Sequence, residues 1–215
     1  MADKLQLYNN ALLDLGERFL GALDEDREPR HLLDLSWDTG AIDWCLEQGQ
    51  WSFAMRGIKL EYTPSIEPQW GFRRAFAKPD DYVRTAALCS DEYFRTPIMA
   101  CFDEAQFWFC DIDTIYVRYV SNDPDYGSNL GKWPNSFQKV VSSRLAAEIV
   151  TKLTTDPNRI KAAQMALDWN LKDARAKDAL NQPVVFAPPG TWTIARRGRN
   201  TRRDWGNRGG GSLIG

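Results

Sequence analysis

Two pairs of amphipathic segments, one on each side of residues 51–123, constrain the fold of this chain most strongly. In each segment apolar side chains recur at spacings of three and four, which places them on one face of a helix. The sequence therefore predicts four helices, each of which must bury its apolar face. The apolar positions are Leu5, Tyr8, Leu12, Leu15 and Phe19; Leu32, Leu35, Thr39, Ile42 and Leu46; Phe137, Val141, Leu145, Ile149 and Leu153; and Ile160, Ala163, Leu167, Leu171 and Ala174.

Proline, aspartate and glycine mark the expected ends of these helices. Pro29 suits the first turn of the second helix, and Gly49 suits its end. Asp156 and Pro157 form an N-cap and first-turn pair, so the fourth helix is predicted to begin there and to run to Asn181. The polar face of that helix is rich in lysine, arginine and aspartate.

Residues 51–123 have the pattern of a β region. Short runs of aromatic and β-branched residues are separated there by prolines and aspartate-rich turns. Residues 114–120 give the strongest strand signal, with Ile115, Val117 and Tyr119 on one side. Residues 111–113 are predicted to form a hairpin turn. The expected strands lie within residues 51–55, 58–62, 82–88, 106–110 and 114–120.

These patterns predict an α+β fold: a four-helix bundle with a mostly antiparallel β insertion between helices 2 and 3, and an extended C-terminal arm. The expected boundaries are residues 1–50 for helices 1 and 2, 51–123 for the β insertion, 124–181 for helices 3 and 4, and 182–215 for the arm. Because residues 196–215 are rich in glycine and poor in apolar side chains, we expect them to be disordered on their own.

Charge divides the chain into an acidic body and a basic arm. The whole chain carries a net charge of −2, but residues 182–215 hold six arginines and one aspartate, which leaves the arm at +5 and the body at −7. This division favours docking of the arm on an acidic partner, either nucleic acid or a protein surface. The candidate binding residues of the arm are Arg196, Arg197, Arg199, Arg202, Arg203 and Arg208, with Trp192 and Trp205 as apolar anchors.

The arginines have three interpretations. Five of them fall within residues 196–203 and can follow a phosphate backbone, in which case binding depends strongly on salt. They can equally make bidentate contacts with protein carboxylates, or form a solvated tail without a defined partner. The scattered apolar anchors Trp192, Ile194 and Trp205 favour a protein partner.

Sequence motifs of the common enzyme classes are missing. The four cysteines form no CxxC pair and His31 is the one histidine, so we expect no metal site and no cofactor, and a surface or capping role for His31. No apolar run is long enough to span a membrane. A glycan hydrolase with two carboxyl groups about 5–10 Å apart remains an alternative. The acids in or near the β region are Glu47, Glu61, Glu67, Asp80, Asp81, Asp91, Glu92, Asp103, Glu104, Asp111 and Asp113.

Four short motifs occur in a characteristic order. They are the Leu5–Gly16 helix with its acidic linker Asp24–Asp26, the triplet Trp51-Ser52-Phe53, the stretch Lys78–Arg84, and the helix that follows Trp133-Pro134. In this order the chain resembles the head-to-tail adaptors of short-tailed phages, the tail tubular protein A family. The resemblance covers roughly residues 4–181.

This resemblance implies a structural virion protein that is not an enzyme. Proteins of the family form a twelve-fold ring under the portal, and in related adaptors a C-terminal arm reaches the portal. We therefore expect three protein partners, namely the portal, the tail nozzle or tubular protein, and further copies of this chain. Double-stranded DNA would pass through the ring without sequence-specific contacts. The chain would be made in the host cytoplasm and reside in the neck of the virion. The alternatives are an adaptor-borne glycan hydrolase with paired carboxylates and a DNA-binding module that uses the arginines.

Overall fold

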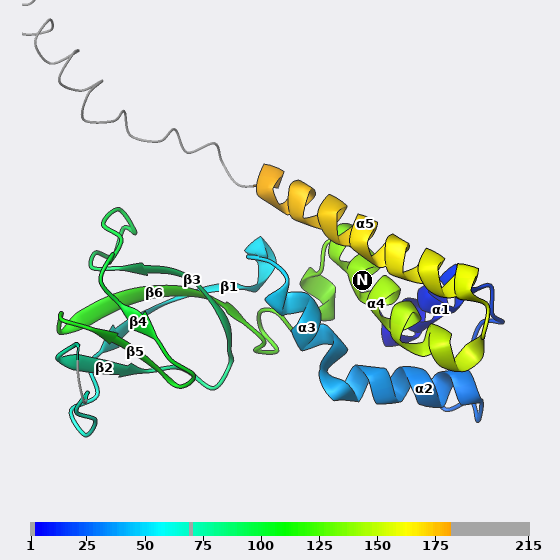
Figure 1. The fold of residues 1–215 in the computed structure, drawn as a ribbon, viewed down its shortest axis with the longest axis horizontal. Helices are drawn as coiled ribbons and strands as arrows, with labels where there is room; N and C mark the ends of the chain where they lie inside the picture. The colour runs from blue at the N-terminus through cyan, green and yellow to red at the C-terminus, as the bar shows by residue number, and fades with distance from the viewer. Residues whose placement is uncertain (1–2, 69–70, 182–215) are drawn as a thin grey trace, which may run out of the picture. The chain divides into compact units, whose positions relative to one another are not determined.

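The computed structural model describes residues 3–68 and 71–181, which belong to one compact unit, Met1–Gln182 (Figure 1). Helices lie at both ends of the described chain and strands lie between them. The helices are α1 (Lys4–Leu15), α2 (Glu28–Ser36), α3 (Ile42–Glu47), α4 (Asn135–Leu153) and α5 (Pro157–Asn181). Shorter turns are the π-helical η1 (Trp37–Ala41) and the 3₁₀ turns η2 (Ser52–Ala54) and η3 (Leu130–Lys132).

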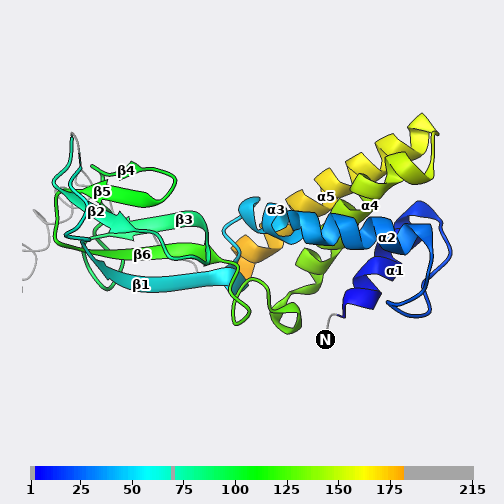
Figure 2. The ribbon, with the colours of Figure 1, turned by 90° about the horizontal axis from the view of Figure 1, so that it is seen from below.

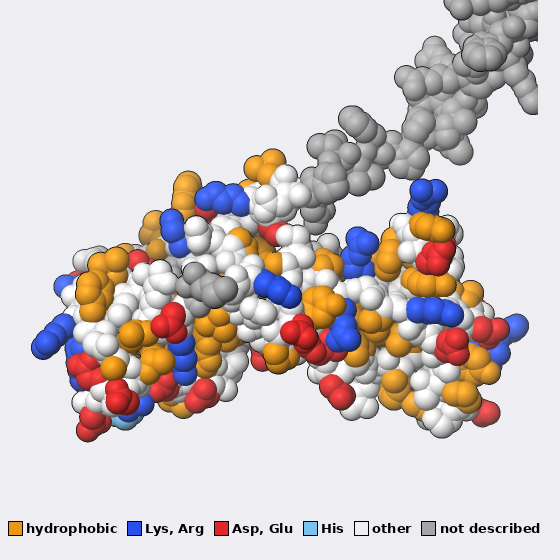
Figure 3. Space-filling model, turned by 180° about the vertical axis from the view of Figure 1, so that it is seen from behind, with side chains coloured by type: hydrophobic (Ala, Val, Ile, Leu, Met, Phe, Trp, Pro, Cys, Tyr) orange, Lys and Arg blue, Asp and Glu red, His pale blue; other side chains and the backbone are white. Residues whose placement is uncertain are grey.

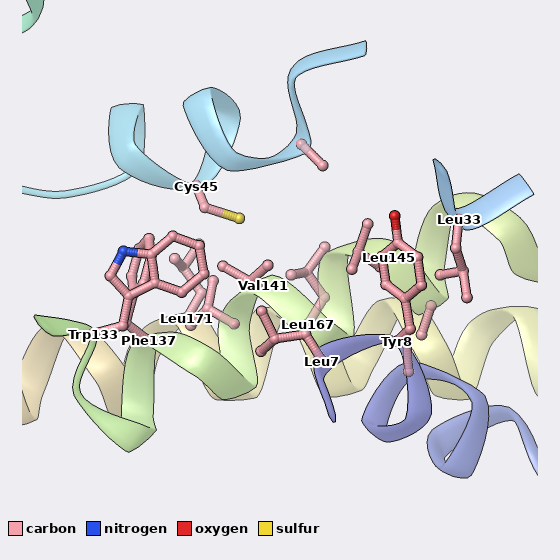
Figure 4. Packing of buried hydrophobic residues seen from close by; sticks show 14 of the residues in the cluster. Leu7, Tyr8, Leu33, Cys45, Trp133, Phe137, Val141, Leu145, Leu167 and Leu171 are labelled. Atoms are coloured by element: carbon pink, nitrogen blue, oxygen red, sulfur yellow. The ribbon is translucent and has the colours of Figure 1, made fainter. Parts of the chain in front are cut away.

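Helix α4 is the centre of the helical part, because α1, α2 and α5 all pack against it. Figure 1 and Figure 2 show α4 between α5 on one side and α2 on the other. Burial of the apolar faces stabilises this arrangement, at roughly 25 cal/mol for each Å² of apolar surface removed from water. Figure 4 shows the core at close range, with the buried side chains of Leu7, Tyr8, Leu33, Cys45, Trp133, Phe137, Val141, Leu145, Leu167 and Leu171.

The second predicted helix is broken in the middle. Gly40 has a φ of 97°, a left-handed conformation that suits glycine, and the chain changes direction there between α2 and α3. The predicted apolar stripe of this segment is confirmed in part, because Leu46 is buried and Leu32 and Ile42 pack against the core. It is wrong for Leu35, which is 62% exposed, while α2 buries Leu33.

The strands form two antiparallel sheets of three strands each. The first has the order β1 (Met55–Glu61), β6 (Thr114–Ser121), β3 (Tyr82–Cys89). The second has the order β2 (Arg74–Ala77), β5 (Phe107–Cys110), β4 (Phe102–Asp103). The predicted hairpin turn at residues 111–113 joins β5 to β6, which lie in different sheets, so the hairpin prediction is wrong.

The sheets enclose a small core of their own. The strand predicted at residues 114–120 is confirmed as β6, and its Ile115, Val117 and Tyr119 side chains are buried together with Phe76 and Trp108. Alternation along β6 turns Val120 the other way, into the core of the helical part. A single strand thus contributes to both cores.

The predicted four-helix bundle with one β insertion is wrong. The described chain is α+β, but the break at Gly40 divides the predicted second helix, and α3 contacts β3 as well as α4. The strands form two separate three-stranded sheets around a second core, and Val120 of β6 also packs into the helical core. No helix among residues 3–68 and 71–181 is long and apolar enough to cross a membrane.

Candidate functional site

The arm residues proposed to bind a partner lie outside the described residues. They are Trp192, Arg196, Arg197, Arg199, Arg202, Arg203, Trp205 and Arg208. Helix α5 ends at Asn181, next to the arm. The arm therefore stays a prediction, and the sites below are built from the body.

Several acids of the β region serve to hold that region together. Asp103 forms an ion pair with Lys78 at 2.5 Å and accepts a hydrogen bond from the Thr85 hydroxyl at 2.9 Å. Asp91 accepts hydrogen bonds from the backbone N–H groups of Arg95 and Thr96. These bonds hold the pKa of Asp91 below its usual value, and the bond from Arg95 has the largest effect. Asp113 pairs with Arg74 at 2.7 Å, and Asp111 accepts the backbone N–H of Arg73 at 3.0 Å. These carboxylates are satisfied by neighbours within the chain.

Two other glutamates of the β region share a pocket. Glu67 and Glu104 line a hollow of about 550 Å³, whose wall also includes Phe102, Phe107 and Phe109. The pocket is aromatic with an acidic edge, so it suits an apolar or sugar-like group.

The described residues hold no group of three or more histidine, cysteine or acidic side chains that could bind a metal ion. His31 lies at the surface and its Nε2 is 2.9 Å from the Asp26 carboxylate, which agrees with the surface role predicted for it. Cys45, Cys89, Cys101 and Cys110 are free thiols.

Three of the four motifs that carry the family resemblance have residues at the junction between helices and sheets. Trp51 and Phe53, from the triplet before β1, pack against Phe137 of α4 with ring centroids 5.0 and 4.8 Å away. Trp133, which precedes α4, lies on the same Phe137 ring at 5.1 Å. The buried indole N–H groups are both satisfied, since Trp51 donates to the Cys45 carbonyl and Trp133 to the Gly127 carbonyl. Segments more than 80 residues apart in sequence thus form one aromatic cluster.

The Lys78–Arg84 motif contributes a polar hub within the first sheet and one hydrogen bond to a helix. The Asp81 carboxylate accepts hydrogen bonds from the Ser121 hydroxyl at 2.5 Å, the Arg56 guanidinium at 2.9 Å and the Tyr119 hydroxyl at 3.0 Å. Partial burial opposes ionisation of Asp81, but these three donors outweigh it and hold the pKa below its usual value. The hub joins β1, β6 and the start of β3. Arg84 adds a bond to the Glu47 carbonyl at the end of α3.

Sequence reasoning missed the contact between α5 and the chain before β1. Asp178 of α5 is 7% exposed and accepts hydrogen bonds from the Ser52 hydroxyl at 2.6 Å and the Ser52 backbone N–H at 3.1 Å. Its neighbour Arg175 donates to the Gln48 carbonyl at 2.7 Å. The helical spacing of Asp178 could have predicted its burial, because Asp178 continues the buried stripe of Leu167, Leu171 and Ala174.

An exposed apolar face on α5 was also missed. Met165 and Trp169 are 71% and 74% exposed, and Leu180 is 83% exposed. Side chains of this size on the outside of one helix are typical of a protein contact surface. In Figure 3 hydrophobic and basic side chains are interspersed along the upper edge of the helical part.

Comparison with known proteins adds no family assignment. A scan against protein-family models and a search of curated proteins both found no match to this chain.

Proposed function

We propose that this chain is a structural subunit of a tailed-phage virion, a head-to-tail adaptor that forms a ring between the portal and the tail nozzle. In this role it helps to retain the genome and lets double-stranded DNA pass without sequence-specific contacts. It acts without catalysis. Its place is the neck of the virion, after synthesis in the host cytoplasm.

The observation that carries the proposal is the convergence of the family-like motifs. Trp51-Ser52-Phe53, Lys78–Arg84 and Trp133-Pro134 are separate in sequence. Trp51 and Trp133 pack on Phe137 of α4, and Arg84 donates to the Glu47 carbonyl of α3, so each motif contributes to the junction between helices and sheets. Their convergence supports a common fold element and, through it, the resemblance to the adaptors.

Two further features support a role in assembly. Trp169 and its apolar neighbours on α5 leave a surface suited to another protein. The net charge of −7 on residues 1–181 suits the wall of a channel, because an acidic wall does not retain passing DNA.

The test is binding to the portal protein of the same phage. Full-length chain and a chain that ends at Pro189 are each mixed with purified portal and separated by size-exclusion chromatography. The proposal expects full-length chain to co-elute with the portal, and the shortened chain to lose this binding because it lacks the arginines. A variant with the six arm arginines changed to lysine keeps the charge and is the matched control for bidentate recognition. Binding of DNA instead of portal near 150 mM salt, dependent on the arm, would favour the nucleic-acid module.

A second candidate function is glycan hydrolysis, because Glu67 and Glu104 line one aromatic pocket. Most glycosidases use two carboxyl groups on either side of the scissile bond as catalytic residues. Glu67→Gln and Glu104→Gln would each abolish cleavage of purified cell-wall glycan if this candidate held, while Glu61→Gln, outside the pocket lining, would not. Absence of cleavage by the unaltered protein would end this candidate.

A further inference from the structure

Two uncovered faces lie on opposite sides of the helical part. Leu167 of α5 and Leu33 of α2 both point into the shared core. Trp169 and Leu35 each follow two residues later, about 200° further around their helices, and so point outward. Since α4 separates α5 from α2, the two outward faces lie on opposite sides of the molecule's helical part (Figure 1, Figure 2).

Helix α5 carries two stripes with the heptad spacing of packed helices. One is buried against the core. The second is exposed and has Trp169 near its centre, with Met165 and Lys172 beside it and an alanine one heptad away on either side. Its members are Ala162, Met165, Trp169, Lys172, Ala176 and Ala179. A helix with two such stripes is suited to pack between two other elements. Within the described chain α4 packs against one stripe of α5.

The outer face of α2 is narrower and acidic. Leu35 is its exposed apolar residue, and Glu28, His31 and Asp38 continue the same face. Asp34 of α2 is already paired with Lys4 and Arg30, so Glu28 and Asp38 are the acids of this outer face. In Figure 3 acidic side chains gather along the lower edge of the helical part, the side on which α2 lies.

The α5 face has the opposite charge. Helix α5 has five basic and three acidic residues. Asp178 is buried on Ser52, Asp173 pairs with Lys177, and Arg175 donates to the Gln48 carbonyl. Outside these contacts the helix carries three basic residues and one acid: Arg159, Lys161, Lys172 and Asp168. A basic face with a central tryptophan and an acidic face with a central leucine are complementary in charge and in apolar content.

We propose that the α5 face of one copy binds the α2 face of the next copy. The contact is heterologous, because two α5 faces would bring like charges together, and so would two α2 faces. Repetition of a heterologous contact closes into a ring when the rotation permits. The inference rests on the proposed ring and names the surfaces that would build it.

The test uses two variants that each lose one face. Trp169→Glu disables the α5 face and Leu35→Glu disables the α2 face. Met99→Glu is the matched control, since Met99 is 91% exposed and belongs to neither face. Molar mass is measured by analytical ultracentrifugation over a range of concentrations, with circular dichroism as the check on folding.

The expected results follow from the geometry. Each single variant weakens self-association at least about tenfold, because a buried tryptophan commonly dominates an interface. A mixture of the two variants forms a one-to-one complex and nothing larger, because each contributes its one intact face. Met99→Glu behaves like the unaltered chain. Unimpaired association of Leu35→Glu alone, failure of the mixture to pair, or an unaltered chain that stays monomeric at every concentration would each overturn the proposal.

Binding to the portal separates this inference from the proposed function. If all three variants still load onto the portal as complete rings, the interface is wrong and the adaptor role stands. If the two variants pair in the mixture but the unaltered chain ignores the portal, the interface stands and the adaptor role fails.

Discussion

The carboxylate of Asp178 in α5 binds both the hydroxyl and the backbone N–H of Ser52, at 2.6 and 3.1 Å. This contact attaches the end of the last described helix to the chain that leads into the first strand. We predict that Asp178→Ala lowers the free energy of unfolding by about 2 kcal/mol, because a buried N–H and a hydroxyl lose a charged acceptor.

Urea denaturation measures this change. The control is Asp173→Ala, whose carboxylate is more exposed and pairs with Lys177 on the same helix, and it should cost no more than about 0.5 kcal/mol. Equal effects of the two substitutions would mean that the contact with Ser52 does not stabilise the junction.

The Asp81 hub makes stability depend on pH. Because the folded pKa of Asp81 lies below its usual value, its stabilising contribution is fully present above the unfolded pKa of about 3.9. The contribution is lost as the pH falls from there through the folded pKa. We predict that Asp81→Asn costs about 2 kcal/mol at pH 7 and progressively less below pH 4.

Guanidinium denaturation of both proteins at several pH values checks this prediction. Asp80→Asn alters an exposed neighbour and serves as the control. A difference between Asp81→Asn and the unaltered chain that stayed constant from pH 7 to pH 3 would contradict the linkage.

Gly127 leaves no room for a side chain. A Cβ at this position would lie 2.1 Å from the Ser121 backbone oxygen, and the Gly127 carbonyl accepts the Trp133 indole N–H at 2.7 Å. Gly127→Ala should therefore lower the free energy of unfolding by about 2 kcal/mol or more, as expected for overpacking against backbone. In thermal denaturation Gly21→Ala, whose Cβ would meet one flexible side chain at 3.8 Å, should leave the midpoint nearly unchanged. An equal loss of stability in both variants would contradict the prediction, because the effect would then not depend on the close contact at Gly127.

Thiol reactivity should follow burial. Burial raises the pKa of Cys45 to about 12, and Cys45 is fully buried, so its thiolate is scarce and inaccessible in the folded chain. Cys101 is partly exposed. We predict that iodoacetamide at pH 8 modifies Cys101 first and leaves Cys45 unmodified until the protein unfolds, as followed by peptide mass spectrometry. Early modification of Cys45 would show that the helical core opens readily.

The long C-terminal helices could be predicted from sequence, because their signals are local. The periodic stripes and the Asp156-Pro157 start placed helices that the structure confirms as α4 and α5. The break in the second helix was not predictable in this way. Gly40 is tolerated within many helices, and its left-handed φ depends on how α2 and α3 pack on either side.

The pairing of strands depended on distant partners. β6 was evident from residues 114–120, yet it pairs with β1 and β3 and not with β5, its neighbour in sequence. Short β2 and β4 carry little signal of their own and were not predicted. The predicted four-helix bundle with one insertion was wrong because local sequence patterns do not determine which distant segments pair.

The exposed apolar residues of residues 1–181 were harder to predict from sequence than the buried ones. Met165 and Trp169 stand among charged residues, so the sequence predicts a polar outer face for α5. A search for a second heptad stripe would have found it. The arm was predicted from composition alone and lies outside the described residues, so both its extended form and its role stay predictions.

The most direct test of the adaptor role is the molar mass of this chain on its portal, measured by light scattering. We predict that the full-length chain adds a ring-sized mass to the portal and that a chain ending at Pro189 adds none. If the full-length chain added no mass to the portal at any salt concentration, the adaptor role would be contradicted.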